Sequence, residues 1–151
     1  MKLWPWFVLL TALCWGAYVP TLHQGQTALG KNSALRAFLF VGLAYAVVSV
    51  GVIAYLWATK AEAWQFNSAG AVMSTIAGVL GALGALGIVF ALKNEGKPIY
   101  VAPLVFAGAP IVNTLVSMMW HRPAEPPRIW FYLGIALAAL GGALVLRFKP
   151  S

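Results

Sequence analysis

The feature that most constrains this chain is a series of five long apolar runs separated by short polar connectors. The hydrocarbon core of a bilayer is about 30 Å thick and is crossed by roughly 20 residues of helix. Inside it every backbone polar group needs a partner within the protein, which favours helices for runs of this length. We therefore expect five transmembrane helices, at about Leu3–Leu22, Leu35–Ala58, Ala69–Leu92, Pro98–Trp120 and Ile129–Leu146.

The composition excludes several classes of protein. Of 151 residues, 62% are hydrophobic and 9% are charged, which is too little charge to cover the surface of a water-soluble domain. The net charge of +7 comes from Lys and Arg spread over the ends of the apolar runs, whereas nucleic-acid binders cluster them on one face. The sequence predicts an all-α membrane protein, a bundle of five transmembrane helices forming one domain over residues 1–151. Its partner is the lipid bilayer and not nucleic acid.

The connectors "HQGQTALGKNSA", "TKAEAWQFNS", "KNEGK" and "HRPAEPPR" are predicted to be loops, the last stiffened by three prolines. The first apolar run resembles a signal peptide, but it is long and has no small-x-small cleavage site, so we expect a retained span. Cys14 is the only cysteine, which excludes a disulfide framework within the chain. Leu13 precedes it where a lipoprotein signal needs a small residue, so Cys14 is interpreted as a packing residue.

The basic residues and tryptophans indicate an orientation. Four basic residues lie on the side of the N-terminus and six on the opposite side, a weak positive-inside signal for an external N-terminus. The tryptophans near the ends of the runs all fall on the N-terminal side: Trp4, Trp6, Trp57, Trp64, Trp120 and Trp130. The two faces of the protein therefore meet different surroundings. We expect the bacterial inner (plasma) membrane, with the N-terminus outside and the C-terminus in the cytoplasm.

The fourth run contains prolines and polar residues on one face. At 3.6 residues per turn, one stripe comprises Pro103, Phe106, Ala107, Pro110, Asn113, Thr114 and Ser117. Pro103 and Pro110 are expected to kink the helix, because each lacks the N–H that a helix carbonyl needs. An unpaired polar group in hydrocarbon costs several kcal/mol, by rough estimate, so the stripe is expected to face the interior or a wet cavity.

Matching polar residues occur on three other runs. Thr11, Trp15 and Tyr18 align on the first, and Tyr45 and Ser49 lie one turn apart on the second. The third run contains Gly78, Gly81, Gly84 and Gly87, a spacing that suggests close helix packing, with the fourth run as the candidate partner. Each residue also has a plainer interpretation: hydroxyls bonded to their own helix, tyrosine as core and glycines as packing. The predicted solute cavity is lined by Trp15, Tyr18, Tyr45, Ser49, Asn113 and Thr114.

Three stretches resemble EamA-like domains of the drug/metabolite transporter superfamily. "TALCWGAYVP" is similar to the start of such a domain, "PIYVAPLVFAGAPIVNTLVSM" to its fourth helix, and "WFYLGIALAALGGALVLRFKP" to its closing helix. The resemblance implies one five-helix half of a transporter. Members of the family pair two inverted halves around a central cavity, where Trp15, Tyr18, Asn113 and Thr114 would be expected.

The chain differs from EamA-like transporters in two respects. A single half needs a second inverted copy or a membrane partner, and no helix has an ionisable residue in its middle for ion coupling. We therefore expect transport of a small neutral or zwitterionic solute, as a homodimer or with a partner. The alternative is a non-transporting accessory or scaffold subunit of a larger membrane complex. An enzyme is not expected, and nothing beside His23 or His121 suggests a metal or another cofactor.

Overall fold

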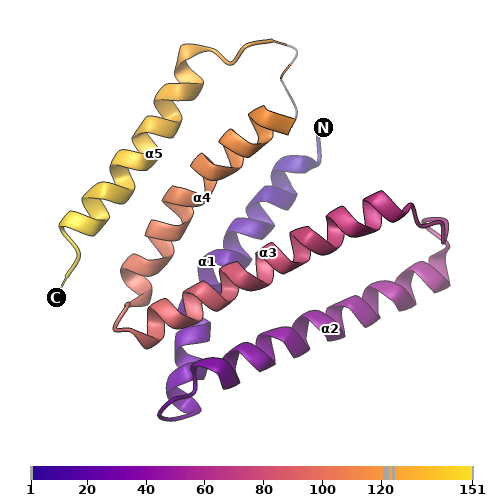
Figure 1. The fold of residues 1–151 in the computed structure, drawn as a ribbon, viewed down its shortest axis with the longest axis horizontal. Coiled ribbons are helices and arrows are strands. Elements are labelled where there is room, and N and C mark those ends of the chain that lie inside the picture. The colour runs from indigo at the N-terminus through magenta and orange to yellow at the C-terminus, as the bar shows by residue number, and fades with distance from the viewer. Residues whose placement is uncertain (1, 121–122, 124, 151) are drawn as a thin grey trace. The chain divides into compact units, whose positions relative to one another are not determined.

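A computed structural model describes residues 2–120, 123 and 125–150 of the chain. All regular secondary structure within these residues is helical. The five helices follow one another through short connectors (Figure 1): α1 (Trp4–Ala28), α2 (Ala34–Thr59), α3 (Ser68–Lys93), α4 (Pro98–Trp120) and α5 (Ile129–Arg147). Each is long and apolar enough to cross a membrane. The predicted fold class, an all-α protein with five membrane-spanning helices, is confirmed.

Four of the five helices begin and end within one residue of the predicted spans, and α4 matches its span at both ends. Helix α4 continues without interruption through Pro103 and Pro110. The caps explain the sharp ends elsewhere. Asn67 precedes α3, and its side-chain oxygen accepts hydrogen bonds from the backbone N–H groups of Ala69 (2.9 Å) and Gly70 (3.3 Å). Lys60 ends α2 in the left-handed conformation and donates its N–H to the Leu56 carbonyl.

Helix α1 is the exception, because it continues to Ala28 where a loop was predicted from His23 onward. That part of the loop prediction is wrong. Outside the hydrocarbon a helix no longer needs apolar residues, and here tertiary contacts support two additional turns. The Gln26 side chain donates to the Val89 carbonyl of α3 (3.1 Å), and the Leu29 N–H continues the helical ladder to Gly25 (3.0 Å). The helix ends at Ala28, and the chain turns away at Gly30, whose φ of +84° is a conformation that glycine adopts at little cost.

The contacts within the chain divide it into two compact units, which are described separately. The first unit comprises Met1–Pro20 with Gly96–Ser151, and the second comprises Thr21–Glu95. Within α1 the division falls at Pro20, where the helix lacks a backbone donor. The single five-helix domain predicted from the sequence stays a prediction.

In the first unit, α4 packs against α5 (Figure 1). The two helices come close together at Gly142, which is buried: a Cβ added there would lie 2.9 Å from the Cβ of Ala107. Only a residue without a side chain allows the two backbones to come this close. Towards the end of the pair where α4 begins and α5 finishes, the Lys149 ammonium lies 5.3 Å from the centre of the Tyr100 ring, within the range of a cation–π interaction.

In the second unit, α2 packs against α3, and the last turns of α1 join them. The buried apolar side chains gather near the connector between α1 and α2 and the end of α3: Leu22, Ala34, Ala37, Val89 and Leu92. Gln26 lies among them and is only 7% exposed. This buried cluster determines where the two additional turns of α1 end.

Most large apolar side chains are exposed along the whole length of the helices. Leu39 on α2, for example, is 71% exposed, and Leu80 on α3 is 63% exposed. Apolar surface on this scale is unfavourable in water and favourable in lipid. All six tryptophans of the predicted girdle are among the exposed residues, and each lies within three residues of a helix end or in a connector.

The hydrogen bond between Gln26 and Val89 gives a first prediction. We expect Gln26→Leu to lower the free energy of unfolding by about 1 kcal/mol, the net value of a typical buried hydrogen bond. Gln24→Leu is the matched control, because Gln24 is exposed on the same helix. Reversible unfolding in mixed detergent micelles measures both variants. Equal stability of the two variants would show that the Gln26 bond does not hold α1 to α3.

Candidate functional site

The candidate site is an open groove in the first unit, between the N-terminal part of α1 and the middle of α4. It encloses about 910 Å³, within the range of small-molecule sites. From α1 it is lined by two neighbouring rows spaced four residues apart: Phe7, Val8, Thr11, Ala12, Trp15 and Gly16. From α4 it is lined by Phe106, Ala109, Pro110 and Asn113. We call it the Trp15–Asn113 groove.

Two aromatic rings form one wall of this groove. The centroids of the Trp15 and Phe106 rings lie 6.2 Å apart, with their planes tilted by 50°. Trp15 remains 54% exposed, so most of its indole surface is open to an occupant. Aromatic rings in this arrangement offer a large, rigid apolar surface.

Asn113 supplies the polar chemistry of the groove. Its side chain is exposed, and within the described part of the chain its amide has no hydrogen-bond partner. The lining has two other polar groups, the Thr11 hydroxyl and the Trp15 indole N–H. Thr11 donates its hydroxyl proton to the carbonyl of Phe7 (2.8 Å). The amide of Asn113 can therefore both donate to and accept from an occupant, whereas the Thr11 proton is already used.

Prolines on both helices add backbone carbonyls to this polar chemistry. Pro110 cannot donate to the carbonyl of Phe106, and Pro20 cannot donate to the carbonyl of Gly16. Phe106 and Gly16 both line the groove. The two helices thus each have a carbonyl that lacks its usual helical donor beside the same space.

Among the described residues, no ionisable side chain lines the Trp15–Asn113 groove. Its lining suits an occupant with an apolar body and one hydrogen-bonding group.

The predicted cavity residues belong to both units, so one cavity shared by all of them stays a prediction. Trp15 and Asn113 lie in the Trp15–Asn113 groove, whereas Tyr45 lines a second groove of about 410 Å³ between α2 and α3, together with Gly78 and Gly81. The Ser49 hydroxyl donates to the Tyr45 carbonyl (2.9 Å), the plainer interpretation of such a residue. Tyr18, Ser49 and Thr114 line neither groove.

The four glycines of α3 have open space beside them within their own unit. A Cβ added at Gly78, Gly81, Gly84 or Gly87 would meet no heavy atom within 4 Å. The α2–α3 contact therefore does not require these glycines. The packing of this face against the fourth helix joins the two units and stays a prediction.

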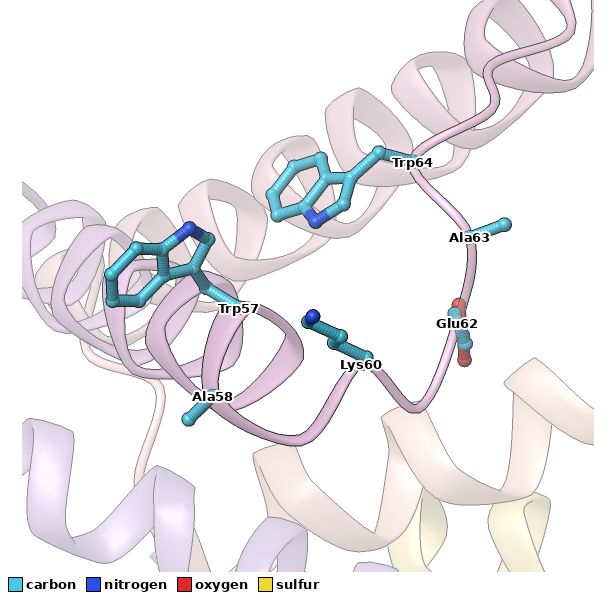
Figure 2. A pocket seen from close by; sticks show the side chains of 6 residues that line it. All are labelled: Trp57, Ala58, Lys60, Glu62, Ala63 and Trp64. Atoms are coloured by element: carbon cyan, nitrogen blue, oxygen red, sulfur yellow. The ribbon is translucent and has the colours of Figure 1, made fainter.

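A third hollow, of about 790 Å³, lies where α2 is connected to α3. Figure 2 shows the side chains of Trp57, Lys60 and Trp64 directed into the same space. The Trp64 ring also contacts Phe66 edge to face, with centroids 6.0 Å apart. Aromatic rings beside an ammonium group are typical of a membrane interface, which agrees with the predicted tryptophan girdle.

Sequence reasoning missed some of the groove residues. Pro20 falls inside the predicted first span, but the Gly16 carbonyl that it leaves without a helical donor was not predicted to border a cavity. Phe7 and Val8 are apolar, so no pattern distinguished them from lipid-facing residues. His121 and Arg122 lie outside the described residues. Within residues 2–120, 123 and 125–150, no three His, Cys, Asp or Glu side chains are grouped as a metal site.

The chain was compared with models of known protein families, with curated proteins and with solved structures. None of the three comparisons finds a match. The resemblance to EamA-like domains therefore stays a prediction, and the chemistry of the groove has to support any function on its own.

Proposed function

We propose that this multi-pass membrane protein is one half of a transporter and passes a small neutral or zwitterionic solute along the Trp15–Asn113 groove. The observation that carries the proposal is the composition of that groove: three aromatic rings and one amide without a partner, with no ionisable side chain among the described residues that line it. An uncharged lining cannot couple transport to a bound proton or ion through a side chain. The solute would move down its own gradient.

Because the groove is open, we expect the working transporter to contain a second protein chain that covers it. An unpaired amide facing acyl chains is costly, so a second copy or a partner is needed to cover Asn113 and leave a wet passage. The resemblance to EamA-like domains supports the same arrangement, because that family pairs two inverted halves. The shallow bias of Lys and Arg permits a second copy in the opposite orientation. For a single orientation we propose an external N-terminus in a bacterial plasma membrane.

Uptake into proteoliposomes tests the proposal without a known solute. The purified protein is reconstituted in both orientations and exposed to a metabolite extract from cells grown on ¹³C-glucose. Mass spectrometry then identifies labelled solutes inside the vesicles. We expect neutral or zwitterionic solutes to enter faster than into protein-free vesicles, with no dependence on a proton gradient. Uptake equal to that of protein-free vesicles would contradict a transporter.

The second candidate function is that of a scaffold subunit in a larger membrane complex. The open glycine face of α3 favours it, because small residues let a partner helix approach closely. Extraction from the native membrane in a mild detergent separates the two candidates. A homodimer with termini accessible from both sides of the membrane agrees with the transporter. A single orientation within a large complex, together with no uptake, agrees with the scaffold.

A further inference from the structure

The Trp15–Asn113 groove has its paired aromatic rings and its amide at different ends. The Trp15 and Phe106 rings have centroids 6.2 Å apart, and Asn113 lies two turns farther along α4, an axial distance of about 10 Å. Side chains on a helix lean towards its N-terminus, so we expect the Asn113 amide to lean towards the rings. The lining of α4 between the two ends consists of Ala109 and Pro110, whose short side chains leave room for the body of an occupant.

The amide of Asn113 determines which polar group of a solute fits. It presents a carbonyl acceptor and an N–H donor side by side in one plane, and both are open to an occupant. The complementary group is another amide whose N–H and C=O lie on the same side, as they do in a cyclic amide. Two parallel hydrogen bonds then form, as they do when an asparagine binds the edge of a nucleic-acid base.

The lining also determines the charge of the solute. No ionisable side chain lines the groove among the described residues. A zwitterion would bring two full charges into this groove, and each would lose water without gaining a partner of opposite charge, which is unfavourable. A neutral solute exchanges its hydrogen bonds with water for equivalent ones with the lining. Of the two solute classes in the proposed function, the groove therefore favours the neutral one.

We propose that the solute is a neutral fused-ring heteroaromatic molecule with a cyclic amide at its edge. This names the substrate class of the same groove and rests on the proposed function. The flat rings lie against Trp15 and Phe106, and the cyclic amide pairs with Asn113. Fused rings bridge the distance between the two ends of the groove better than a single small ring. The aromatic wall and the amide therefore make separate contributions to specificity.

Three matched probes test the two contributions. Carbostyril has flat fused rings and a cyclic amide, N-methylcarbostyril lacks the N–H, and octahydrocarbostyril keeps the amide without the flat rings. Tritiated carbostyril is bound to the purified full-length protein in a mild detergent, and the unlabelled probes compete with it. We expect the N-methyl probe to compete about tenfold more weakly than carbostyril, and the octahydro probe about fivefold more weakly. Equal competition by all three would mean partition into detergent and overturn the proposal.

Two variants assign each preference to its residue. Asn113→Leu should lose the preference for the N–H probe and keep the preference for flat rings, and Trp15→Leu should do the reverse. Trp6→Leu is the matched control and should keep both, because Trp6 is 58% exposed on the same helix and does not line the groove. Each preference compares two probes on one variant, so general damage to the protein does not imitate the result. Both preferences lost together, or neither lost, would overturn the assignment.

Uptake into proteoliposomes separates this inference from the proposed function. Unlabelled carbostyril, at concentrations near its Kd, should slow the uptake of the ¹³C-labelled solutes. Uptake that carbostyril does not slow would overturn the substrate class and leave the transporter proposal standing. No uptake of any solute, with both binding preferences intact, would end the transporter proposal and support the groove as a binding site for this class of molecule.

Discussion

Asn113→Leu reduces uptake of the ¹³C-labelled solutes by roughly tenfold or more while the protein still inserts and accumulates. Leucine has the same number of side-chain heavy atoms in the same branched arrangement, so it replaces the amide with apolar groups and changes the shape of the groove little. A polar group of the solute would then enter the groove without its partner, at a cost of about 1–3 kcal/mol. Initial rates of uptake into proteoliposomes containing equal amounts of folded protein give the measurement.

Two control variants make this result specific. Asn113→Gln keeps an amide and should retain a substantial part of the uptake. Thr114→Val removes a hydroxyl from the next residue, which does not line the groove, and should leave uptake unchanged. Undiminished uptake by Asn113→Leu would end the assignment of this residue to the site, even if the protein transports. No uptake by the unmutated protein would end the transporter proposal itself.

Gly142→Ala destabilises the contact between α4 and α5, and we expect a loss of about 1–3 kcal/mol in the free energy of unfolding. The added Cβ would lie 2.9 Å from the Cβ of Ala107, which is too close for two methyl groups. The side chain of Ala107 has no rotamer that moves its Cβ away, so the helices themselves must separate. Unfolding in mixed micelles, with steric trapping as a second method, measures the change.

The neighbouring glycine is a matched control for this variant. A Cβ added at Gly141 would meet nothing within 4 Å, and alanine has a better helix propensity than glycine. Gly141→Ala should therefore be neutral or slightly stabilising. If both alanine variants were equally stable, the close approach of α4 and α5 at Gly142 would be wrong.

The helices themselves could be predicted closely because each signal is local. A run of apolar residues of membrane length has to be helical, and polar or capping residues such as Asn67 mark its ends. The same reasoning failed at His23–Ala28, because it treated polar residues as the end of the helix. The bonds that support the additional turns join Gln26 to Val89, 63 residues away in the chain, and no local pattern reveals them.

The candidate site could be predicted only in part. The stripe on α4 identified Pro110 and Asn113, and the alignment on α1 identified Trp15, all of which line one groove. Tyr45 was assigned to the same cavity because it lies one turn from Ser49 on a matching polar stripe. Within the second unit it lines a groove with the glycines of α3, and one cavity shared with Trp15 and Asn113 stays a prediction. A polar residue in an apolar run indicates a face that avoids lipid, but it does not indicate which neighbour covers that face.

The sequence by itself therefore determined the number, extent and environment of the helices, since these depend on the run of residues within each span. Only the tertiary structure decided which faces meet. Gly142 contacts α4 closely, whereas a Cβ added at the glycines of α3 would meet no heavy atom within 4 Å, and three segments of the second unit form a hollow lined by His23, Lys31 and Lys93. The physical reason is that helices in lipid are apolar all round. Burial of apolar side chains therefore does not distinguish the inner face from the outer one, and close packing and hydrogen bonds between distant segments do.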